Sequence, residues 1–197
     1  MLVFSLFLRL YAWFSVKKNS FWINNPIVTQ KKIFNTLVRQ GKKTAFGKDF
    51  NFSNIKNYSD FKLNVPVKDY EGFRPYIERV LSGEKNVLWP GIPLYFCKTS
   101  GTTSGVKYIP ISKASMPFHI KCAKDAILSY VAETGITLPL SGKNIFIQGS
   151  PVLEKKNGFH LGRLSGIVAH HVPWYLKGSN LPSFKTNSVV DWEEKVD

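Results

Sequence analysis

A loop rich in glycine and hydroxyl side chains joins two short apolar segments, and this pattern most constrains the fold of the chain. Residues 95 to 111 read YFCKTSGTTSGVKYIPI. Pro110 disfavours a helix after the loop, because proline lacks the backbone N–H that a helix interior uses. The order of apolar segment, loop and apolar segment predicts a β-hairpin with the loop at its tip.

The residues of this loop are of the kinds that bind phosphate. Glycine lets the backbone approach an anion closely, and successive N–H groups in such a turn can converge on phosphate oxygens. Hydroxyl groups add hydrogen-bond donors, and a lysine adds a compact positive charge. We therefore predict that the loop binds the phosphates of a nucleotide. The expected phosphate-binding residues are Thr99, Ser100, Gly101, Thr102, Thr103, Ser104, Gly105 and Lys107.

The loop differs from the two commonest nucleotide-binding loops. A Walker A loop has four residues between its glycines and then Gly-Lys-Ser/Thr at the start of a helix. Here three residues separate Gly101 from Gly105, and Val106 stands between Gly105 and the lysine. The Gly-x-Gly-x-x-Gly pattern of dinucleotide-binding folds is also absent from the sequence. On composition alone an ordinary polar turn is the alternative, and the flanking apolar segments with Lys107 favour the phosphate loop.

The loop resembles the first motif of the adenylate-forming enzymes, which activate carboxylic acids with ATP. The longer segment 98–112 is similar to the auxin-responsive promoter family of acyl acid–amino acid amido synthetases, in particular its bacterial members. Val106 stands where most acyl-CoA ligases carry proline, which favours the amide-forming branch. Segments similar to the same family recur along the chain at 25–26, 46–49, 69–72, 87–91, 148–151 and 162–170.

This resemblance implies a fold, a reaction and a set of site residues. The implied fold is mixed α/β, part of a large N-terminal domain in which helices pack on a β-sheet. The implied cofactors are ATP and Mg²⁺, and the implied partners are a carboxylic acid and an amine or amino acid. Lys107 would be the catalytic residue, with Met116 and His119 near the nucleotide. The acyl pocket would include Arg163, Ser165 and Gly166.

The net charge of +14, from 27 Lys and Arg against 13 Asp and Glu, suggests an anionic partner. The lysines form scattered pairs rather than one long run, so nucleic acid is not expected and ATP is preferred. Two alternatives stay open: a nucleotide-binding or interaction module without catalysis, and a basic nucleic-acid-binding protein. The adjacent His170 and His171 cannot face one metal ion together, so no protein metal ligands are expected.

The two cysteines and the N-terminal segment bear on the cellular compartment. Cys97 and Cys122 have no metal-binding spacing, so we expect two buried free thiols, as is typical of the reducing cytoplasm. Residues 1–16 are strongly apolar, but Arg9 interrupts them and they are shorter than the roughly 18 to 20 residues that span a bilayer. We predict a helix buried in the domain and no stable membrane insertion. Peripheral membrane contact is the less favoured alternative.

The remaining segments are expected to form one incomplete N-terminal domain. Its parts are an apolar helix at 1–24, a mainly helical region at 25–93, the hairpin at 94–111, and helix, strand and loops at 112–197. Family members are much longer, and their adenosine-binding motifs come later in the sequence. The chain is therefore expected to be a fragment that binds ATP weakly and makes no amide alone.

Five local expectations can be compared directly with a structure. Helices are expected to follow Asn25-Pro26, ending at Gly41, and to begin at Pro75, ending at Gly83. A central strand is expected at 144–148, and a helix capped by Ser188 near the end. The helix 115–133 is expected to face inward through Met116, Ile120, Ala123, Ile127 and Tyr130.

Overall fold

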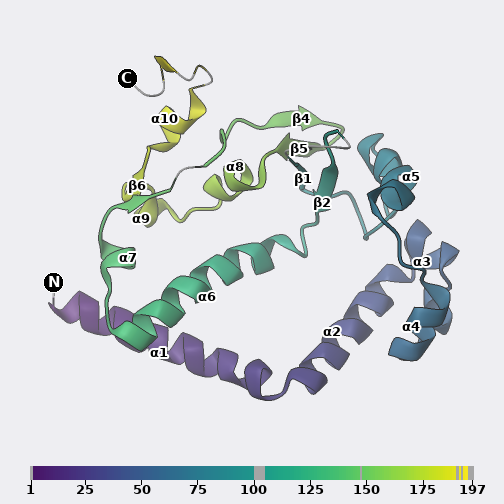
Figure 1. The fold of residues 1–197 in the computed structure, drawn as a ribbon, viewed down its shortest axis with the longest axis horizontal. Coiled ribbons are helices and arrows are strands. Elements are labelled where there is room, and N and C mark those ends of the chain that lie inside the picture. Colours follow the sequence, from purple (N-terminus) through teal and green to yellow (C-terminus); the bar gives the residue numbers. More distant parts are fainter. Residues whose placement is uncertain (1, 100–104, 147, 190, 192, 195–197) are drawn as a thin grey trace. The chain divides into compact units, whose positions relative to one another are not determined.

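The structure is a computed structural model that describes residues 2–99, 105–146, 148–189, 191 and 193–194 (Figure 1). The chain divides into two compact units. The hairpin unit comprises Asn25–Lys113 and Glu154–Leu161. The α1–α6 unit comprises Met1–Asn24, Ala114–Leu153 and Gly162–Asp197. Helices and strands occur together, so the mixed α/β class predicted from the sequence is confirmed.

The hairpin unit places helices against a four-stranded sheet. Its helices are α2 (Pro26–Gly41), α3 (Ala45–Asp49), the 3₁₀ helix η1 (Phe52–Asn54), α4 (Tyr58–Asn64) and α5 (Tyr70–Leu81). Its strands are β1 (Tyr95–Lys98), β2 (Tyr108–Ile111), β4 (Glu154–Lys156) and β5 (Phe159–Gly162), in the spatial order β2-β1-β5-β4. The β1–β2 and β4–β5 pairs are antiparallel.

A hydrophobic core joins helix α5 to the two central strands. Phe96 of β1 and Phe159 of β5 are both fully buried, and their rings meet edge to face at a centroid distance of 4.8 Å. Ile77 and Val80 of α5 belong to the same buried cluster, together with Val87 and Leu161. The helix therefore packs on the sheet, as the predicted fold requires.

The first helices of this unit follow their sequence signals, with one correction. Helix α2 begins at Pro26 and ends at Gly41, as expected. Helix α5 begins at Tyr70 rather than at Pro75, and Pro75 lies inside it. The reason is the cap, because the carboxylate of Asp69 accepts a hydrogen bond of 2.9 Å from the Gly72 N–H.

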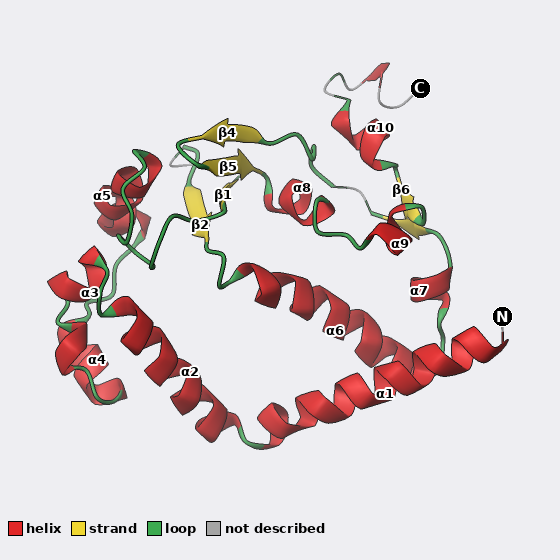
Figure 2. Cartoon of the chain, turned by 180° about the vertical axis from the view of Figure 1, so that it is seen from behind, coloured by secondary structure: helices red, strands yellow, loops and turns green. Residues whose placement is uncertain are grey.

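The α1–α6 unit is built around two long helices. It contains α1 (Leu2–Asn24), α6 (Met116–Thr134), α7 (Leu138–Ser141), α8 (Leu164–Ala169), α9 (Trp174–Lys177) and α10 (Phe184–Ser188). Figure 2 shows α1 running alongside the end of α6, and Ala12, Leu128 and Val131 form the buried cluster between them. The short strands β3 (Asn144–Ile145) and β6 (Asn180–Leu181) pair in parallel.

Two sequence expectations for this unit are wrong. The buried side chains of α6 are Met116, Leu128 and Val131, whereas Ala123, Ile127 and Tyr130 are exposed, because α1 packs on a different stripe of α6. The expected central strand 144–148 is only the pair Asn144–Ile145, with Ile145 exposed; residue 147 lies outside the described residues. A helix not expected from the sequence, α10, is capped by Ser183, whose hydroxyl accepts the Thr186 N–H; the helix expected after Ser188 lies largely outside the described residues.

The N-terminal segment forms the expected helix, but the helix is not buried. Most apolar side chains of α1 are open to solvent, because only one stripe of the helix meets α6. Within the described residues, no helix is both long and apolar enough to cross a membrane.

The two cysteines differ in exposure, and this generates a test. Cys97 in β1 is buried, as expected, whereas Cys122 on α6 is exposed, which corrects the expectation for that residue. Burial also raises the pKa of the Cys97 thiol. The thiolate is the reactive form, so both effects protect Cys97 from alkylation.

We expect iodoacetamide to modify Cys122 at least roughly tenfold faster than Cys97 in the folded chain, because only Cys122 is accessible. Timed labelling followed by mass spectrometry of the two cysteine peptides measures both rates. Urea should bring the two rates close together. Equal rates without urea would contradict the placement of Cys97 in the sheet.

Candidate functional site

The predicted hairpin is present, and its two strands hold the ends of the loop together. Lys98 of β1 lies opposite Tyr108 of β2 in the antiparallel register. One further pair extends this ladder, since the Thr99 N–H donates to the Lys107 carbonyl at 3.0 Å and the Lys107 N–H donates to Thr99 Oγ1 at 3.3 Å. The loop therefore leaves the sheet between Thr99 and Lys107. The predicted phosphate-binding residues outside the described part of the chain are Ser100, Gly101, Thr102, Thr103 and Ser104.

Gly105 supplies the unusual backbone conformation at the described end of the loop. Its φ of +77° lies in the left-handed region that glycine adopts without steric cost. Apart from its chain neighbours, no heavy atom of the described residues lies within 4 Å of the position that a Cβ would occupy there. This side of Gly105 is therefore open among the described residues.

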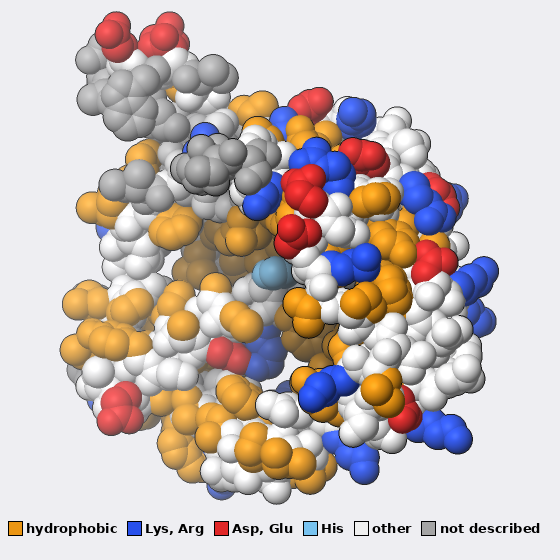
Figure 3. Space-filling model, turned by 45° about the vertical axis from the view of Figure 1, so that its right-hand side comes forward, with side chains coloured by type: hydrophobic (Ala, Val, Ile, Leu, Met, Phe, Trp, Pro, Cys, Tyr) orange, Lys and Arg blue, Asp and Glu red, His pale blue; other side chains and the backbone are white. Residues whose placement is uncertain are grey.

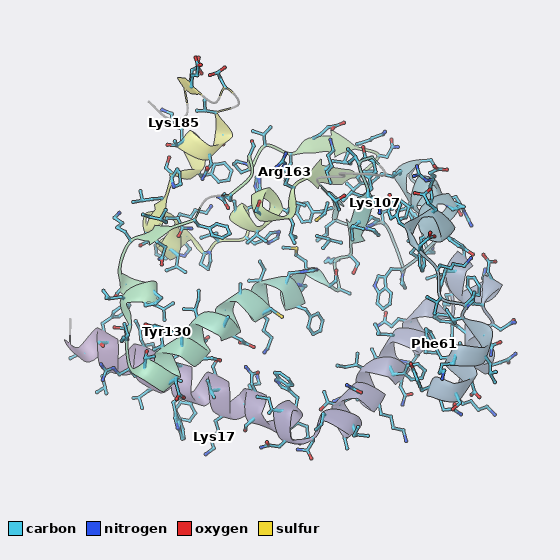
Figure 4. All side chains as sticks on the ribbon, in the orientation of Figure 1. Lys17, Phe61, Lys107, Tyr130, Arg163 and Lys185 are labelled. Atoms are coloured by element: carbon cyan, nitrogen blue, oxygen red, sulfur yellow. The ribbon has the colours of Figure 1, made fainter. Side chains whose placement is uncertain are left out.

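Lys107, the predicted catalytic residue, is held over an aromatic ring. Its Nζ lies 5.5 Å from the ring centroid of Tyr70, within the range of a cation–π interaction. The Tyr70 hydroxyl in turn accepts a hydrogen bond of 2.8 Å from the Tyr108 N–H. Tyr70 is the first residue of α5, so it ties this helix to the second strand and restricts the neighbouring Lys107, which is labelled in Figure 4.

Neighbouring charges leave Lys107 without a neutralising carboxylate. Arg74 makes two hydrogen bonds to Glu71, of 2.6 and 2.7 Å, and these lower the pKa of Glu71. On the adjacent strand, Lys98 pairs with Glu154 at 3.0 Å. Among the described residues Lys107 makes no ion pair, so its charge is available to an anion.

Sequence reasoning missed the role of Tyr70. A tyrosine next to a helix cap is an ordinary core residue on pattern alone, and nothing in the spacing connects it to a strand 38 residues later. The only available signal was that segment 69–72 resembles the same family as the loop.

The donor groups at this hairpin fit the phosphates of ATP. An ammonium group, the Thr99 hydroxyl and an open backbone turn are the donors that anion sites use. For Mg²⁺ the fit is indirect, because the described residues contain no group of three or more His, Cys, Asp or Glu side chains that could hold a metal ion. A Mg²⁺ ion here would depend on phosphate oxygens for most of its ligands.

The hairpin unit also has a second basic surface that does not include the loop. A groove of about 360 Å³ is lined by Arg39, Gln40, Lys43, Asn86 and Pro90. It offers a competing location for an anion. Figure 3 shows other Lys and Arg side chains scattered over one face among hydrophobic and uncharged ones.

The other predicted site residues belong to the α1–α6 unit. Met116 and His119 lie in the first two turns of α6, where Met116 is buried and His119 is exposed. Arg163, Ser165 and Gly166 lie at or near the start of α8. Their role in binding an acid stays a prediction.

The three residues near α8 come together around one turn of backbone, 149–151. The Ser165 hydroxyl accepts a hydrogen bond of 3.0 Å from the Gly149 N–H. A Cβ at Gly166 would lie 2.2 Å from the Ser150 carbonyl oxygen, so only glycine permits this contact. Ser165 and Gly166 therefore hold the turn in place, and Arg163 is the exposed member of the set.

A comparison with protein families decides the identity of this fold. A model described as the GH3 family N-terminal domain matches residues 18–194. The chain belongs to the GH3 family. The family predicted from the loop and the recurring segments is thereby confirmed.

Individual relatives of this GH3 chain are amido synthetases. It is 29% identical over 82 residues to the indole-3-acetic acid-amido synthetase GH3.2 of Arabidopsis thaliana, covering 41% of this chain and 15% of that protein. It is 33% identical over 85 residues to the indole-3-acetic acid-amido synthetase GH3.15 of the same plant, covering 42% of this chain and 14% of that protein.

Solved structures show the same fold. The GH3.15 acyl acid amido synthetase matches with a TM-score of 0.68 at 20% identity, covering 82% of this GH3 chain and 28% of that one. A second structure, AtGH3.15 acyl acid amido synthetase in complex with 2,4-DB, matches with a TM-score of 0.61 at 23% identity, covering 77% and 26%. The chain thus spans only a small part of the length of the proteins that it resembles.

Tyr70→Phe tests the attachment of the hairpin in this GH3 chain. The change removes the oxygen that accepts the Tyr108 N–H but keeps the ring under Lys107. We expect the free energy of unfolding in urea to fall by about 1–2 kcal/mol, because a partly buried N–H loses its partner. The exposed Tyr58 provides the control, since Tyr58→Phe should change stability by less than about 0.5 kcal/mol. Equal effects of the two changes would show that the hydrogen bond contributes nothing.

Proposed function

We propose that this GH3 chain is part of an ATP-dependent enzyme that joins a carboxylic acid to an amine or amino acid. The observation that carries the proposal is the hairpin, which leaves the Lys107 ammonium without a carboxylate partner beside an open glycine turn. The names of the amido synthetase relatives supply the class of reaction.

The proposed reaction has two steps. In the first, a carboxylate oxygen of the acid bonds to the α-phosphorus of ATP, and the bond from that phosphorus to pyrophosphate breaks. In the second, the nitrogen of the amine bonds to the acyl carbon, the carbon–oxygen bond to AMP breaks, and the nitrogen loses a proton. The products are an amide, AMP and pyrophosphate.

The residues of the hairpin would stabilise the charge that develops in the first step. Pyrophosphate gains negative charge as it leaves, and Lys107 would balance that charge from a fixed position over Tyr70. The Thr99 hydroxyl, with Ser100, Thr102, Thr103 and the N–H groups near Gly105, would hold the phosphate oxygens. Mg²⁺ would add positive charge between the phosphates.

Two further groups of residues belong to the proposal. His119, exposed on α6, would lie near the nucleotide together with Met116. Arg163 would contact the carboxylate of the acid, while Ser165 and Gly166 hold the turn 149–151 in place. Both assignments rest on the resemblance to the family.

A nucleotide-binding module without catalysis is the second candidate. It is favoured by one observation, namely that the chain covers only 14–15% of the curated relatives described above. A segment of this length could contain the predicted phosphate loop, while the chemistry depends on other parts of a longer protein. Both candidates require ATP to bind at the hairpin.

We expect residues 1–197 to bind ATP weakly, and Lys107→Ala to weaken binding about 10- to 100-fold through the loss of a charged donor. Equilibrium dialysis with labelled ATP measures both affinities. Lys62→Ala, which removes an exposed lysine from α4, should leave the affinity unchanged. Equal binding by the Lys107 variant and the unaltered chain would overturn the role given to the loop.

Exchange of labelled pyrophosphate into ATP distinguishes the two candidates. We expect no exchange from residues 1–197 alone, because the acid, the phosphates and the adenosine must all be held in reacting geometry. A GH3 polypeptide extended to the length of the solved relatives should exchange in the presence of its acid, and Lys107→Ala or Ser100→Ala should slow it. ATP binding with no exchange by the extended polypeptide on any acid of a broad panel would support the module instead.

A further inference from the structure

Helix α1 packs on α6 through one stripe of mixed side chains. Ala12 is fully buried against Leu128 and Val131, and Leu8 and Val16 on the same stripe are half-buried. At one end the Ser5 hydroxyl lies 3.2 Å from that of Thr137, just beyond α6, and at the other the Asn19 side chain donates to Asp125 at 2.9 Å. This stripe covers only one side of α1.

The opposite side of α1 carries large apolar side chains. In an α-helix, residues at spacings of three, four and seven share a face, and the positions below are spaced in this way. We call this set the outer face of α1, and its side chains are 51 to 84% exposed. The outer face comprises Val3, Leu6, Phe7, Leu10 and Phe14. A helix on a protein surface ordinarily turns such a stripe toward the core, so the outer face of α1 is left without the cover that its apolar side chains ordinarily have.

Basic groups border this outer face. Helix α1 contains Lys17 and Lys18 and no Asp or Glu, and its remaining basic residue, Arg9, lies instead beside Gly135. Lys17 Nζ lies 4.8 Å from the Trp13 ring centroid, and Figure 4 labels Lys17 on α1. Lys124 of α6 places its Nζ 3.5 Å from the Tyr11 hydroxyl. The border therefore combines aromatic rings with ammonium groups, which are the side chains enriched where a membrane meets water.

The positive charge of α1, and the position of its outer face in the sequence, indicate which kind of partner binds there. A second copy of the chain would bring one cationic helix against another, which repels. The family match begins at residue 18, so the whole outer face precedes the region shared with the GH3 family. An anionic lipid surface suits both features, because it accepts apolar side chains and attracts the lysines.

We infer that the outer face of α1 binds the interface of an anionic membrane. Its apolar side chains enter the boundary of the acyl chains, and Lys17 and Lys18 meet the lipid phosphates. The helix lies in the plane of the surface, consistent with the finding that no described helix is long and apolar enough to span. This surface is separate from the proposed chemistry, since none of its residues belongs to the phosphate loop.

Flotation of the 197-residue chain with vesicles tests the inference. One set of vesicles is phosphatidylcholine alone, and the other contains about 30 mol % phosphatidylserine to make the surface anionic. We expect the chain to float with the anionic vesicles and much less with the neutral ones. Lys17→Ser with Lys18→Ser should weaken binding to the anionic vesicles about 30-fold, since each lysine contributes to the attraction.

A double change on the outer face, Leu10→Glu with Phe14→Glu, should abolish flotation. Its matched control is Leu63→Glu with Val67→Glu, which alters two fully open apolar side chains elsewhere and should float like the unaltered chain. Circular dichroism establishes that the variants keep their helices. No flotation of the unaltered chain, or equal loss in the control, would overturn the inference. So would a dimer in light scattering that the outer-face change dissociates without any vesicle binding, because a second copy would then be the occupant.

Discussion

The edge-to-face contact between Phe96 and Phe159 holds the β1–β2 hairpin to the rest of its unit. The two rings are fully buried and come from strands more than 60 residues apart in the sequence. Because they meet, β1 becomes a central strand between β2 and β5. A hairpin of two four-residue strands would be marginal alone in water, so the pairing of β1 with β2 depends on this contact.

Tyr70 contacts both the second strand of that hairpin and the positively charged side chain of Lys107. Its hydroxyl binds the Tyr108 N–H, and its ring lies under the Lys107 ammonium. The neighbouring cations are neutralised, Arg74 by Glu71 and Lys98 by Glu154. Among the described residues Lys107 makes no ion pair, and the Glu71 carboxylate acts on it only through a weaker, longer-range interaction, so the Lys107 ammonium is available to an anion.

Local chemistry made some features predictable from the sequence. The hairpin followed from Pro110 and the glycine-rich loop, and the start of α2 followed from Pro26. Features that depend on a partner element were not predictable. The side of α6 that is buried depends on its contacts with Ala12 and Asn19 of α1. Cys122 lies outside those contacts and is therefore exposed. Tyr70 acts on a distant strand and has no local signature.

Backbone amide chemical shifts on addition of ATP test the central claim most directly. If the hairpin holds the phosphates, the amide signals of Thr99, Gly105 and Lys107 should shift together with a single affinity, and pyrophosphate should reproduce the change. The basic groove is the natural competitor, because it too would attract an anion. Shifts confined to Arg39, Lys43 and their neighbours, with the hairpin signals unmoved, would contradict the account.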